Sequence, residues 1–166
     1  TYGIIGLGNI GRRVADIAKA FGCRVIYYST SGRNSQPGYE RVSFDELLEQ
    51  SDIVSIHAPL DENTLGLMNK EAFAKMKKSA ILLNVGRGPI INEADLAEAL
   101  NNKTIAAAGL DVLSVEPMQE DNPLRGIKDS ERLLITPHIA WAGVEARNRL
   151  MGIILGQIKE FFKAHE

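Results

Sequence analysis

Three charged or titratable side chains stand beside glycine or proline and could together carry acid–base chemistry. Arg87 lies between two glycines, Glu116 precedes Pro117, and His138 follows Pro137. The planar guanidinium of Arg87 can bind a carboxylate through two hydrogen bonds and so orient a substrate. Histidine is the residue type whose side chain ordinarily titrates near neutral pH. The imidazole of His138 could therefore protonate a carbonyl oxygen or accept a proton from an alcohol. A Glu116 carboxylate bound to the other ring nitrogen would favour the protonated imidazole and fix its orientation.

Each of these residues also has a plainer structural explanation. Arg87 could form a surface ion pair, Glu116 could belong to a turn, and His138 could cap the helix that follows it. For each residue taken singly these alternatives stay open. All three residues nevertheless lie on loops that follow predicted strands, and this joint placement favours the chemical role.

The segment GLGNIG at residues 6–11 matches the G-x-G-x-x-G pattern and stands between a predicted strand and a predicted helix. Gly6 would allow the tight turn, Gly8 would let a pyrophosphate approach the backbone, and Gly11 would let the helix pack closely on the strand. The helix that starts here would present unpaired amides and a partial positive charge to the phosphates. The alternative is a glycine-rich turn without a ligand. The position of the pattern favours a dinucleotide site.

The second predicted strand lacks the acidic residue that usually follows it in dinucleotide-binding domains. No Asp or Glu occurs between Asp16 and Glu40, and the expected position falls near Ser29, Thr30 and Arg33. The two hydroxyls could bind the ribose of NAD, whereas Arg33 could pair with the 2′-phosphate of NADP. A solvated Arg33 without a ligand is an equally open interpretation. We therefore expect NAD as cofactor, with NADP also possible.

Short apolar and β-branched runs alternate with amphipathic segments along the chain. The runs predict strands at residues 2–5, 24–28, 52–56, 80–84 and 104–109, with a weaker one at 133–136. Strands of this continuous apolar character, separated by helices, are typical of a parallel sheet that is buried on both faces. We therefore expect a doubly wound α/β sheet of the Rossmann type, with three αβα layers. Ligands of such sheets bind at the carboxyl ends of the strands.

The helices are predicted from helical spacing and from capping residues. Helices are expected at residues 10–21, after a Ser43 capping box with Glu46, at 70–77, at 93–102 after Asn92, and at 144–163. The first helix is expected to lay a stripe on the sheet formed by Ile10, Val14, Ile17, Ala18 and Phe21. The last helix is expected to bury Leu150, Ile153, Ile154, Ile158, Phe161 and Phe162. Residues 110–132 form the longest irregular connection, and long loops in compact domains are often functional.

The composition is that of a globular protein without a strong charge preference. The 166 residues carry 19 basic and 21 acidic side chains, a net charge of −2, so we expect neither nucleic acid nor a membrane as partner. No apolar run approaches the length of a membrane span. Cys23 is the single cysteine, which excludes an internal disulfide and a multi-cysteine metal site, and we expect no metal. The single cysteine also fits a reducing compartment, so we expect the cytoplasm.

Four further segments complete a recognisable pattern. They are SIHAP at residues 55–59, LNVGRG at 83–88, GLDVLSVEP at 109–117 and TPHIAW at 136–141. Together with the glycine loop they resemble, in type, order and position, the nicotinamide-binding domain of the D-isomer-specific 2-hydroxyacid dehydrogenases. The resemblance covers essentially the whole chain, and it is nearest to the glycerate dehydrogenase (hydroxypyruvate reductase) branch.

The resemblance implies an oxidoreductase that moves a hydride between a nicotinamide cofactor and a small D-2-hydroxy acid or 2-keto acid. It assigns the catalytic roles to Arg87, Glu116 and His138, and it places Asp111 against the nicotinamide carboxamide. His57 would shape the loop near the adenosine half of the cofactor rather than transfer protons. The full set expected to bind cofactor is Gly6, Gly8, Asn9, Ile10, Gly11, Ser29, Thr30, Arg33, His57, Ala58, Pro59, Val85, Gly86, Arg87, Asp111, His138 and Ala140.

The resemblance also implies a domain organisation. Residues 1–166 would form the dinucleotide-binding domain, and the substrate domain would be absent from this chain. Because catalysis in this family needs closure of the cleft between two domains, we expect the chain alone to bind dinucleotide but turn over substrate poorly. We also expect a homodimer through the nucleotide-binding domain, with the final helix and residues 110–132 at an interface.

Three other functions are compatible with parts of this residue pattern. A formate dehydrogenase pairs its histidine with glutamine, whereas Glu116 here favours 2-hydroxy acid chemistry. A dinucleotide-sensing corepressor without metabolic turnover would keep a similar residue set, so it remains the alternative. A methyltransferase that used the glycine loop for S-adenosylmethionine would explain neither Arg87 nor the pairing of Glu116 with His138.

Overall fold

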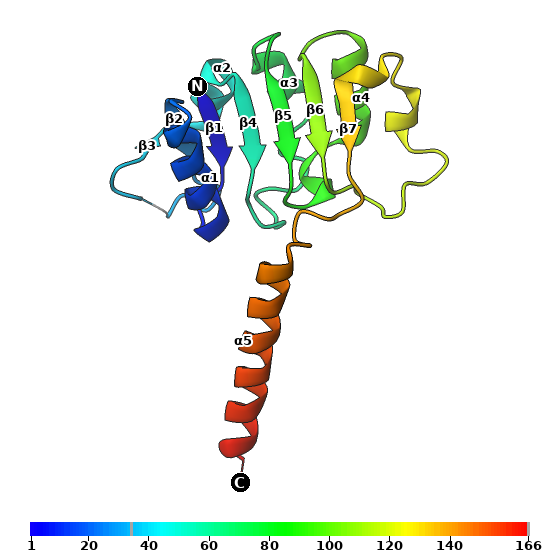
Figure 1. The fold of residues 1–166 in the computed structure, drawn as a ribbon. Helices are drawn as coiled ribbons and strands as arrows, with labels where there is room; N and C mark the ends of the chain where they lie inside the picture. The colour runs from blue at the N-terminus through cyan, green and yellow to red at the C-terminus, as the bar shows by residue number, and fades with distance from the viewer. Residues whose placement is uncertain (34, 166) are drawn as a thin grey trace.

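The predicted apolar runs form a parallel sheet in the computed structural model, which describes residues 1–33 and 35–165. In this part of the chain the sheet has seven strands in the order β3-β2-β1-β4-β5-β6-β7, and every neighbouring pair is parallel (Figure 1). The strands are β1 Tyr2–Ile5, β2 Val25–Tyr28, β3 Glu40–Arg41, β4 Ile53–Ile56, β5 Ile81–Asn84, β6 Ala107–Leu110 and β7 Leu133–Ile135. The expected doubly wound α/β fold is therefore confirmed.

The strand order changes direction beside β1. From β1 the chain builds outward through β2 and β3, and it then returns to place β4 on the other side of β1. The loops that follow β1 and β4 therefore separate at this point and leave a crevice at the carboxyl edge of the sheet. This edge carries the glycine loop and the segments after β5, β6 and β7.

Capping residues set the starts of several helices as the sequence indicates. The helices are α1 Asn9–Ala20, α2 Phe44–Gln50, α3 Lys70–Lys75, α4 Glu93–Asn101 and α5 Val144–Lys163, with 3₁₀ turns η1 Gly88–Ile90, η2 Pro123–Gly126 and η3 Ser130–Arg132. Ser43 and Glu46 form the predicted capping box of α2, and the Asn92 side chain accepts hydrogen bonds at the start of α4. Asn69 caps α3 in the same way, because its side-chain oxygen accepts from the Ala72 amide.

The two faces of the sheet are covered unequally. Helices α2, α3 and α4 cover one face, where Leu47, Phe73 and Leu96 pack with the strands in the main core (Figure 1). On the other face, α1 contacts β1 and β2 and forms a smaller core that includes Ile4 and Tyr27. In the described residues no helix covers this face over β4 to β7. The outer layer on this side is thus α1 alone.

The expected apolar stripe of α1 is right for Ala18, which is buried, and for Val14, which packs against the smaller core, but wrong for Ile10, Ile17 and Phe21. The residues of α1 that are buried are Gly11, Ala15 and Ala18, whereas Ile17 is 58% exposed and Phe21 is 84% exposed. Ile10 is exposed too, and Val14 is half-buried. Small side chains let α1 approach the sheet closely, so the larger apolar ones turn toward the uncovered part of the sheet.

Helix α5 has the predicted bounds but not the predicted burial. It begins beyond the carboxyl edge of the sheet and projects away from it (Figure 1). The side chains expected to be buried, from Leu150 to Phe162, are 38% to 63% exposed. An apolar period predicts that a helix face is suited to burial, but it cannot predict that another element of the chain lies within reach.

Two strand predictions also differ from the structure. Strand β3 was not expected, because Glu40 and Arg41 are charged and the strand is only a two-residue edge. Strand β6 starts at Ala107 instead of Thr104, because the Thr104 amide still donates to the Ala99 carbonyl at the end of α4. The long connection after β6 contains η2 and η3. Among the described helices, none combines the length and the apolar character that crossing a membrane requires.

Candidate functional site

The three glycines of the loop after β1 differ in what requires them. Gly6 has a positive φ of 91°, and a Cβ there would lie 2.8 Å from the Ala58 nitrogen. A Cβ on Gly11 would overlap the Gly6 carbonyl oxygen. Both glycines are therefore needed by the fold itself. Around Gly8, by contrast, a Cβ would meet no atom within 4 Å. The fold does not need a glycine at this position, but a ligand that touches the backbone would.

Helix α1 begins at this open position with an uncapped N-terminus. Gly8 supplies no side-chain cap, and the first turn of α1 contains no acidic residue. The unpaired amides of the first turn and the helix dipole therefore remain available to an anion. The space that a Cβ at Gly8 would fill lies directly at these amides. The loop and the helix start thus fit the phosphates of a dinucleotide.

A cavity of about 410 Å³ lies beside α1, against the loops after β4 and β5. It brings together seven of the residues predicted to bind cofactor, together with Leu60. The lining residues are Ile10, His57, Ala58, Pro59, Leu60, Val85, Gly86 and Arg87. The predicted cofactor residues of three separate segments therefore meet in one place.

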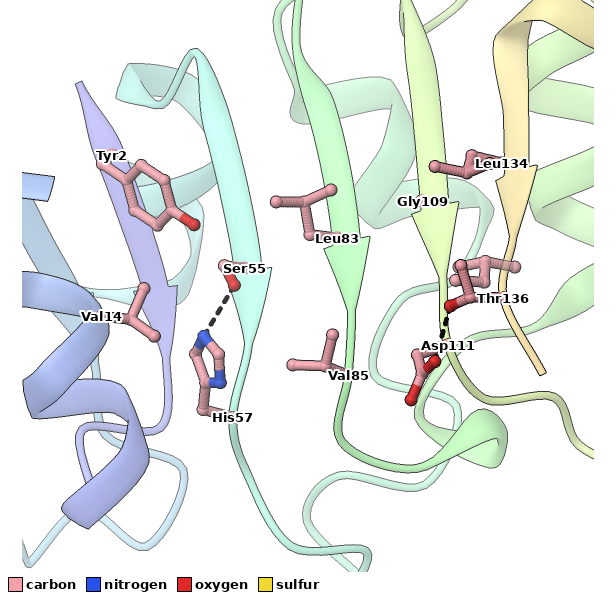
Figure 2. A pocket seen from close by; sticks show the side chains of 11 residues that line it. Tyr2, Val14, Ser55, His57, Leu83, Val85, Gly109, Asp111, Leu134 and Thr136 are labelled. Atoms are coloured by element: carbon pink, nitrogen blue, oxygen red, sulfur yellow. Dashed lines mark hydrogen bonds between the residues drawn. The ribbon is translucent and has the colours of Figure 1, made fainter. Parts of the chain in front are cut away.

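A second cavity, of about 360 Å³, lies over the uncovered face of the sheet beside α1, where Tyr2, Leu83 and Leu134 line it from within the strands (Figure 2). It shares His57 and Val85 with the first cavity and is also lined by Asp111 and Thr136. The Ser55 hydroxyl lies 2.7 Å from His57 Nε2, and Figure 2 shows this contact at the wall of the cavity. Burial lowers the pKa of His57, so the ring is neutral at physiological pH. This environment agrees with a shaping role for His57 rather than proton transfer.

The Asp111 carboxylate organises the segment that carries His138. Its Oδ1 accepts hydrogen bonds from the Thr136 hydroxyl at 2.5 Å and the Ile139 amide at 2.9 Å, and its Oδ2 accepts from the Ala140 amide at 2.8 Å. His138, inside this loop, has a φ of 54°, in the left-handed region. Burial alone would raise the pKa of Asp111, but the hydrogen bonds and the charge of His138 outweigh it and hold that pKa below the ordinary value.

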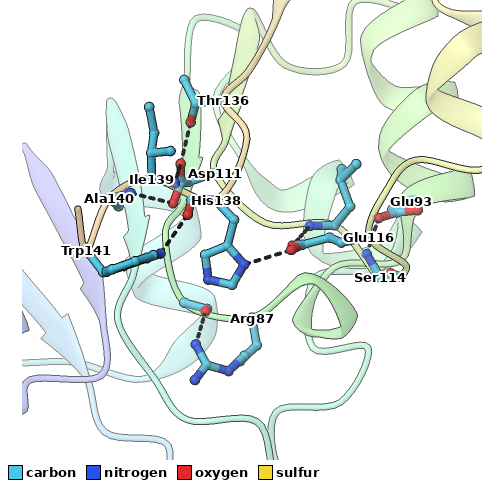
Figure 3. A network of polar contacts seen from close by, with 12 residues as sticks. Arg87, Glu93, Asp111, Ser114, Glu116, Thr136, His138, Ile139, Ala140 and Trp141 are labelled. Atoms are coloured by element: carbon cyan, nitrogen blue, oxygen red, sulfur yellow. Dashed lines mark hydrogen bonds and ion pairs between the residues drawn. The ribbon is translucent and has the colours of Figure 1, made fainter.

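Glu116 and His138 meet although 22 residues separate them. The His138 Nδ1 lies 2.7 Å from Glu116 Oε2, so the hydrogen bond expected from the sequence is present (Figure 3). Glu116 Oε1 accepts from the Leu113 amide at 2.9 Å. This backbone hydrogen bond first, and then the one from His138, lower the pKa of Glu116, so it is ionised at neutral pH. An ionised Glu116 accepts from Nδ1–H, which leaves Nε2 on the opposite side of the ring.

The pair lines a third cavity, of about 500 Å³. Apart from Asp111, Thr136 and the pair itself, its walls are apolar and include Leu113, Met118 and Ile135. Asp111 and Thr136 also line the second cavity, so neighbouring cavities share lining residues. We call the three neighbouring cavities together the groove, whose lining residues extend from Ile10 of α1 to His138.

Arg87 lies on the loop after β5 and lines the first cavity. Its guanidinium donates to the Gly86 carbonyl oxygen at 2.8 Å, and the side chain is otherwise exposed beside His138 (Figure 3). Buried Asn84 shapes the loop, because its amide donates to the Arg87 carbonyl at 3.0 Å and its oxygen accepts from the Gly86 amide. The remaining guanidinium donors face the open groove and suit a carboxylate.

The residues predicted at the end of β2 do not line these cavities. Ser29 is buried, Thr30 is half-buried and Arg33 is exposed. The acidic residues that flank this segment are engaged elsewhere, since Asp16 accepts from the Tyr39 hydroxyl and Glu40 pairs with Arg24. Among the described residues, neither of these flanking carboxylates is thus available at the end of β2. Ser29, Thr30 and Arg33 remain predictions as cofactor contacts.

Three side chains near the site were not predicted as site residues: Thr136 and Trp141 stand in the TPHIAW segment, where Trp141 was expected to serve packing or an interface, and Glu93 was expected only in a helix. Thr136 binds Asp111, and the Trp141 indole donates to the His138 carbonyl at 2.7 Å. Glu93, at the start of α4, accepts from the Ser114 amide at 2.7 Å. Inspection of the sequence predicts only that Glu93 starts a helix, because the partners of its carboxylate lie in an irregular loop. In the described residues, no group of three His, Cys, Asp or Glu side chains is arranged to hold a metal ion.

Comparisons with known proteins agree with this geometry. The family described as "D-isomer specific 2-hydroxyacid dehydrogenase, NAD binding domain" matches residues 1–140. A hydroxypyruvate reductase of Blautia hydrogenotrophica is 48% identical, over 97% of this chain and 50% of its own length. The D-lactate dehydrogenase of Aquifex aeolicus, solved with NAD and lactic acid, is 29% identical and superposes with a TM-score of 0.89 over 98% of this chain and 53% of its own.

An acyclic imino acid reductase, solved with NADPH and D-Arg, is 34% identical and superposes with a TM-score of 0.88 over 98% of this chain and 51% of its own. The chain thus spans about half the length of each of these relatives. The family match covers the glycine loop, Arg87, Asp111, Glu116 and His138 in one stretch. The chain belongs to the NAD-binding domain family of the D-isomer specific 2-hydroxyacid dehydrogenases.

Proposed function

We propose that this chain is the nucleotide-binding domain of an NAD(P)-dependent dehydrogenase that interconverts a small D-2-hydroxy acid and its 2-keto acid, of the glycerate and hydroxypyruvate type. The observation that carries the proposal is the Glu116–His138 pair, 2.7 Å apart, at the end of a groove that starts at the glycine loop. The hydroxypyruvate reductase that is 48% identical supports the substrate class.

The cofactor would lie along the groove. Gly8 and the first amides of α1 would hold its phosphates, and Ile10, Pro59 and Val85 would line its path. When bound, the nicotinamide supplies the hydride for reduction or accepts it in the reverse reaction. Asp111 would contact the carboxamide while it also holds the loop of His138.

The substrate would bind between Arg87 and His138. The Arg87 guanidinium would hold the substrate carboxylate through charge-assisted hydrogen bonds of about 1.5–3 kcal/mol each. The His138 Nε2, opposite the Glu116 contact, would donate a proton to the carbonyl oxygen or accept one from the hydroxyl. Ionised Glu116 would hold the Nδ1 proton and stabilise the charged ring. Acid–base assistance of this kind contributes about 10²–10⁴ in rate.

The same pair bears on the alternative functions. The two reductases and the dehydrogenase compared above support an enzyme, and no observation in the structure favours a corepressor-like protein. Glu116 binds the imidazole where a formate dehydrogenase would have glutamine. A methyltransferase reaction would not require the hydrogen bond between Glu116 and His138.

We propose that residues 1–166 form one dinucleotide-binding domain and that polypeptide outside it provides the substrate domain. The relatives are about twice as long, and the superposition that covers 98% of this chain includes α5. The exposed apolar side chains of α5 and of the open sheet face would then pack against the rest of a longer protein and against a second copy in a homodimer. Cys23 is a free thiol, which supports a reducing, cytoplasmic compartment.

Titration of the chain with NADH tests the proposal. Trp141 donates to the His138 carbonyl, so its fluorescence should report binding in the groove. We expect saturable binding and little or no oxidation of NADH with hydroxypyruvate, because the cleft is incomplete. Failure to bind either NADH or NADPH would contradict the proposed function. Rapid turnover by the 166-residue chain would contradict the proposed division into domains.

A further inference from the structure

The loop that carries Glu116 has little regular structure of its own. Between the end of β6 and the start of η2, the segment from Ser114 to Pro117 is exposed, and it contains neither helix nor strand. An exposed loop of this kind is ordinarily mobile. The hydrogen bond between Glu116 and His138 therefore depends on other groups that hold the loop in place.

Glu93 provides two of these contacts from the first position of α4. Its Oε1 accepts from the Ser114 amide at 2.7 Å, and its Oε2 accepts from the Asn122 side-chain amide at 2.8 Å (Figure 3 shows the Ser114 contact). Asn122 is buried, and its own oxygen accepts from the Leu124 amide at 2.9 Å. One carboxylate thus ties both ends of the segment 114–122 to a helix that is anchored in the core.

The loop also rests directly on the turn below it. A Cβ on Gly88 would overlap the Leu113 carbonyl group and the Ser114 nitrogen. The Leu113 amide in turn donates to Glu116 Oε1. Contacts therefore run without a break from Glu93 through Ser114 and Leu113 to Glu116, and from there to His138.

Helix-dipole stabilisation alone does not explain this arrangement. An acidic residue in the first turn of α4 is favourable wherever its carboxylate lies near the helix start, and Asp95 already fills that role. Dipole stabilisation does not require that both oxygens of Glu93 bind partners 21 and 29 residues away. The direction of the Glu93 side chain is specific to the loop.

We infer that Glu93 is a positioning residue, which holds the loop after β6 so that Glu116 can bind and orient the His138 imidazole. The catalytic meaning of this positioning rests on the proposed function, but the positioning itself does not. Without Glu93, the Ser114 amide loses its partner and Glu116 loses its fixed approach to Leu113 and His138. The pKa of Glu116 would then rise toward that of an ordinary glutamate.

Carboxyl ¹³C NMR titration of Glu116 in the 166-residue chain tests the inference, together with hydrogen exchange of the Ser114 amide. In Glu93→Ala we expect Ser114 to exchange about 10- to 100-fold faster, as expected for the loss of a charge-assisted hydrogen bond. We also expect the Glu116 titration to move upward. Glu93→Gln keeps an acceptor for Ser114 but loses the carboxylate contact to Asn122, so its effects should be intermediate.

Glu98→Ala is the matched control. Glu98 lies on the same helix and carries the same charge, but it pairs with Lys70 on the far side from the loop. The control should leave both the Glu116 titration and the Ser114 exchange unchanged. If Glu93→Ala does not fold, the Glu116 titration and the Ser114 exchange of Glu93→Gln test the inference instead, because glutamine keeps the size of the side chain.

Two results would overturn the inference. One is a Glu116 titration that is the same in wild type, Glu93→Gln and Glu93→Ala; the other is an equal shift in Glu98→Ala. Neither readout needs cofactor or turnover. Failure of this inference is therefore distinguishable from failure of the proposed function, which NADH binding tests.

Discussion

Replacement of Gly8 by alanine separates a ligand requirement from a folding requirement. Gly8 has a φ of −82°, which any residue can adopt, and a Cβ there meets no atom within 4 Å. Alanine is a poorer N-cap than glycine by roughly 0.5–1 kcal/mol, but it restricts the unfolded chain by about 0.4–1 kcal/mol. These terms nearly cancel, so we expect the melting temperature to change by less than about 2 °C.

Binding should respond very differently. The new methyl group would occupy the space beside the first amides of α1, where we place the cofactor phosphates. Losing one or two charge-assisted hydrogen bonds of about 1.5–3 kcal/mol each would weaken NADH binding by about 10-fold to more than 100-fold. Fluorescence titration with NADH measures this, and thermal denaturation followed by circular dichroism measures the stability of the same sample.

Two other glycines complete the comparison. Gly126 also has open space around its Cβ position but lies in η2, away from the groove, so Gly126→Ala should leave both stability and NADH binding unchanged. Gly11→Ala should destabilise the fold by about 1–3 kcal/mol, because its Cβ would meet the Gly6 carbonyl. A Gly8→Ala protein that binds NADH as well as wild type would refute the placement of the phosphates. A Gly8→Ala protein that fails to fold would refute the steric argument.

Three further predictions concern the cofactor, pH and the His138 loop. Because the segment after β2 contains no Asp or Glu that would repel a 2′-phosphate, we expect the chain to bind both NADH and NADPH. Arg33→Ala should weaken the binding of NADPH by roughly 10-fold and leave the binding of NADH unchanged. Parallel titrations with the two cofactors measure this difference. Burial lowers the pKa of His57 below its ordinary value of 6.5. Just below pH 6.5 the unfolded chain therefore binds more protons than the folded chain. The free energy of unfolding should consequently fall as the pH drops through that range. Urea unfolding at several pH values should show this slope in wild type and not in His57→Gln, and an equal slope in both would contradict it. Asp111→Asn places an amide donor opposite the Thr136 hydroxyl and the Ile139 and Ala140 amides, which are all donors. It should therefore lower the free energy of unfolding by about 2 kcal/mol. Asp121→Asn, at an exposed position, is the control and should leave that free energy unchanged.

The sequence predicts best where the determining interactions are local. The capping box of Ser43 and Glu46 spans three residues, and the Asn92 cap spans two or three, so both can be found by inspection of neighbouring residues. The strands were found in the same way, apart from the two-residue edge β3. The glycine loop is local as well, and its predicted position between a strand and a helix is the one the structure shows, between β1 and α1.

Contacts between loops cannot be predicted by inspection of neighbouring residues. Asp111 reaches the Ile139 amide across 28 residues, and Glu93 reaches Ser114 across 21. Neither loop has a periodic pattern that would fix its path, so nothing in the sequence predicts which acceptor meets which amide. The Glu116–His138 contact was expected because the chemistry of a general acid–base pair requires it. The groups that hold the pair together became visible only in three dimensions.

The prediction of which helix side chains are buried is incomplete for a different physical reason. The period of α1 marks Ile10, Val14, Ile17, Ala18 and Phe21 as one apolar stripe, yet among these only Ala18 is buried, beside Gly11 and Ala15. Close packing of a helix on a sheet favours small side chains, and a count of apolar residues does not register this. For α5 the limit is a different one: its apolar side chains from Leu150 to Phe162 are exposed in the described chain, and an apolar period does not predict which element lies within reach.

The end of the groove shows how two irregular loops can hold a short contact. His138 is fixed by Asp111, which follows β6, and Glu116 is fixed by Glu93, which starts α4. Each loop is thus attached by a carboxylate at the end of a regular element, since Asp111 directly follows β6 and Glu93 begins α4. In both cases the carboxylate accepts from backbone amides and not from side chains alone. Amide partners exist whatever residue the loop carries, so this mode of attachment fixes the backbone while leaving the side chains free for substrate. The 2.7 Å contact between Glu116 and His138 follows from two anchors rather than from the loops themselves.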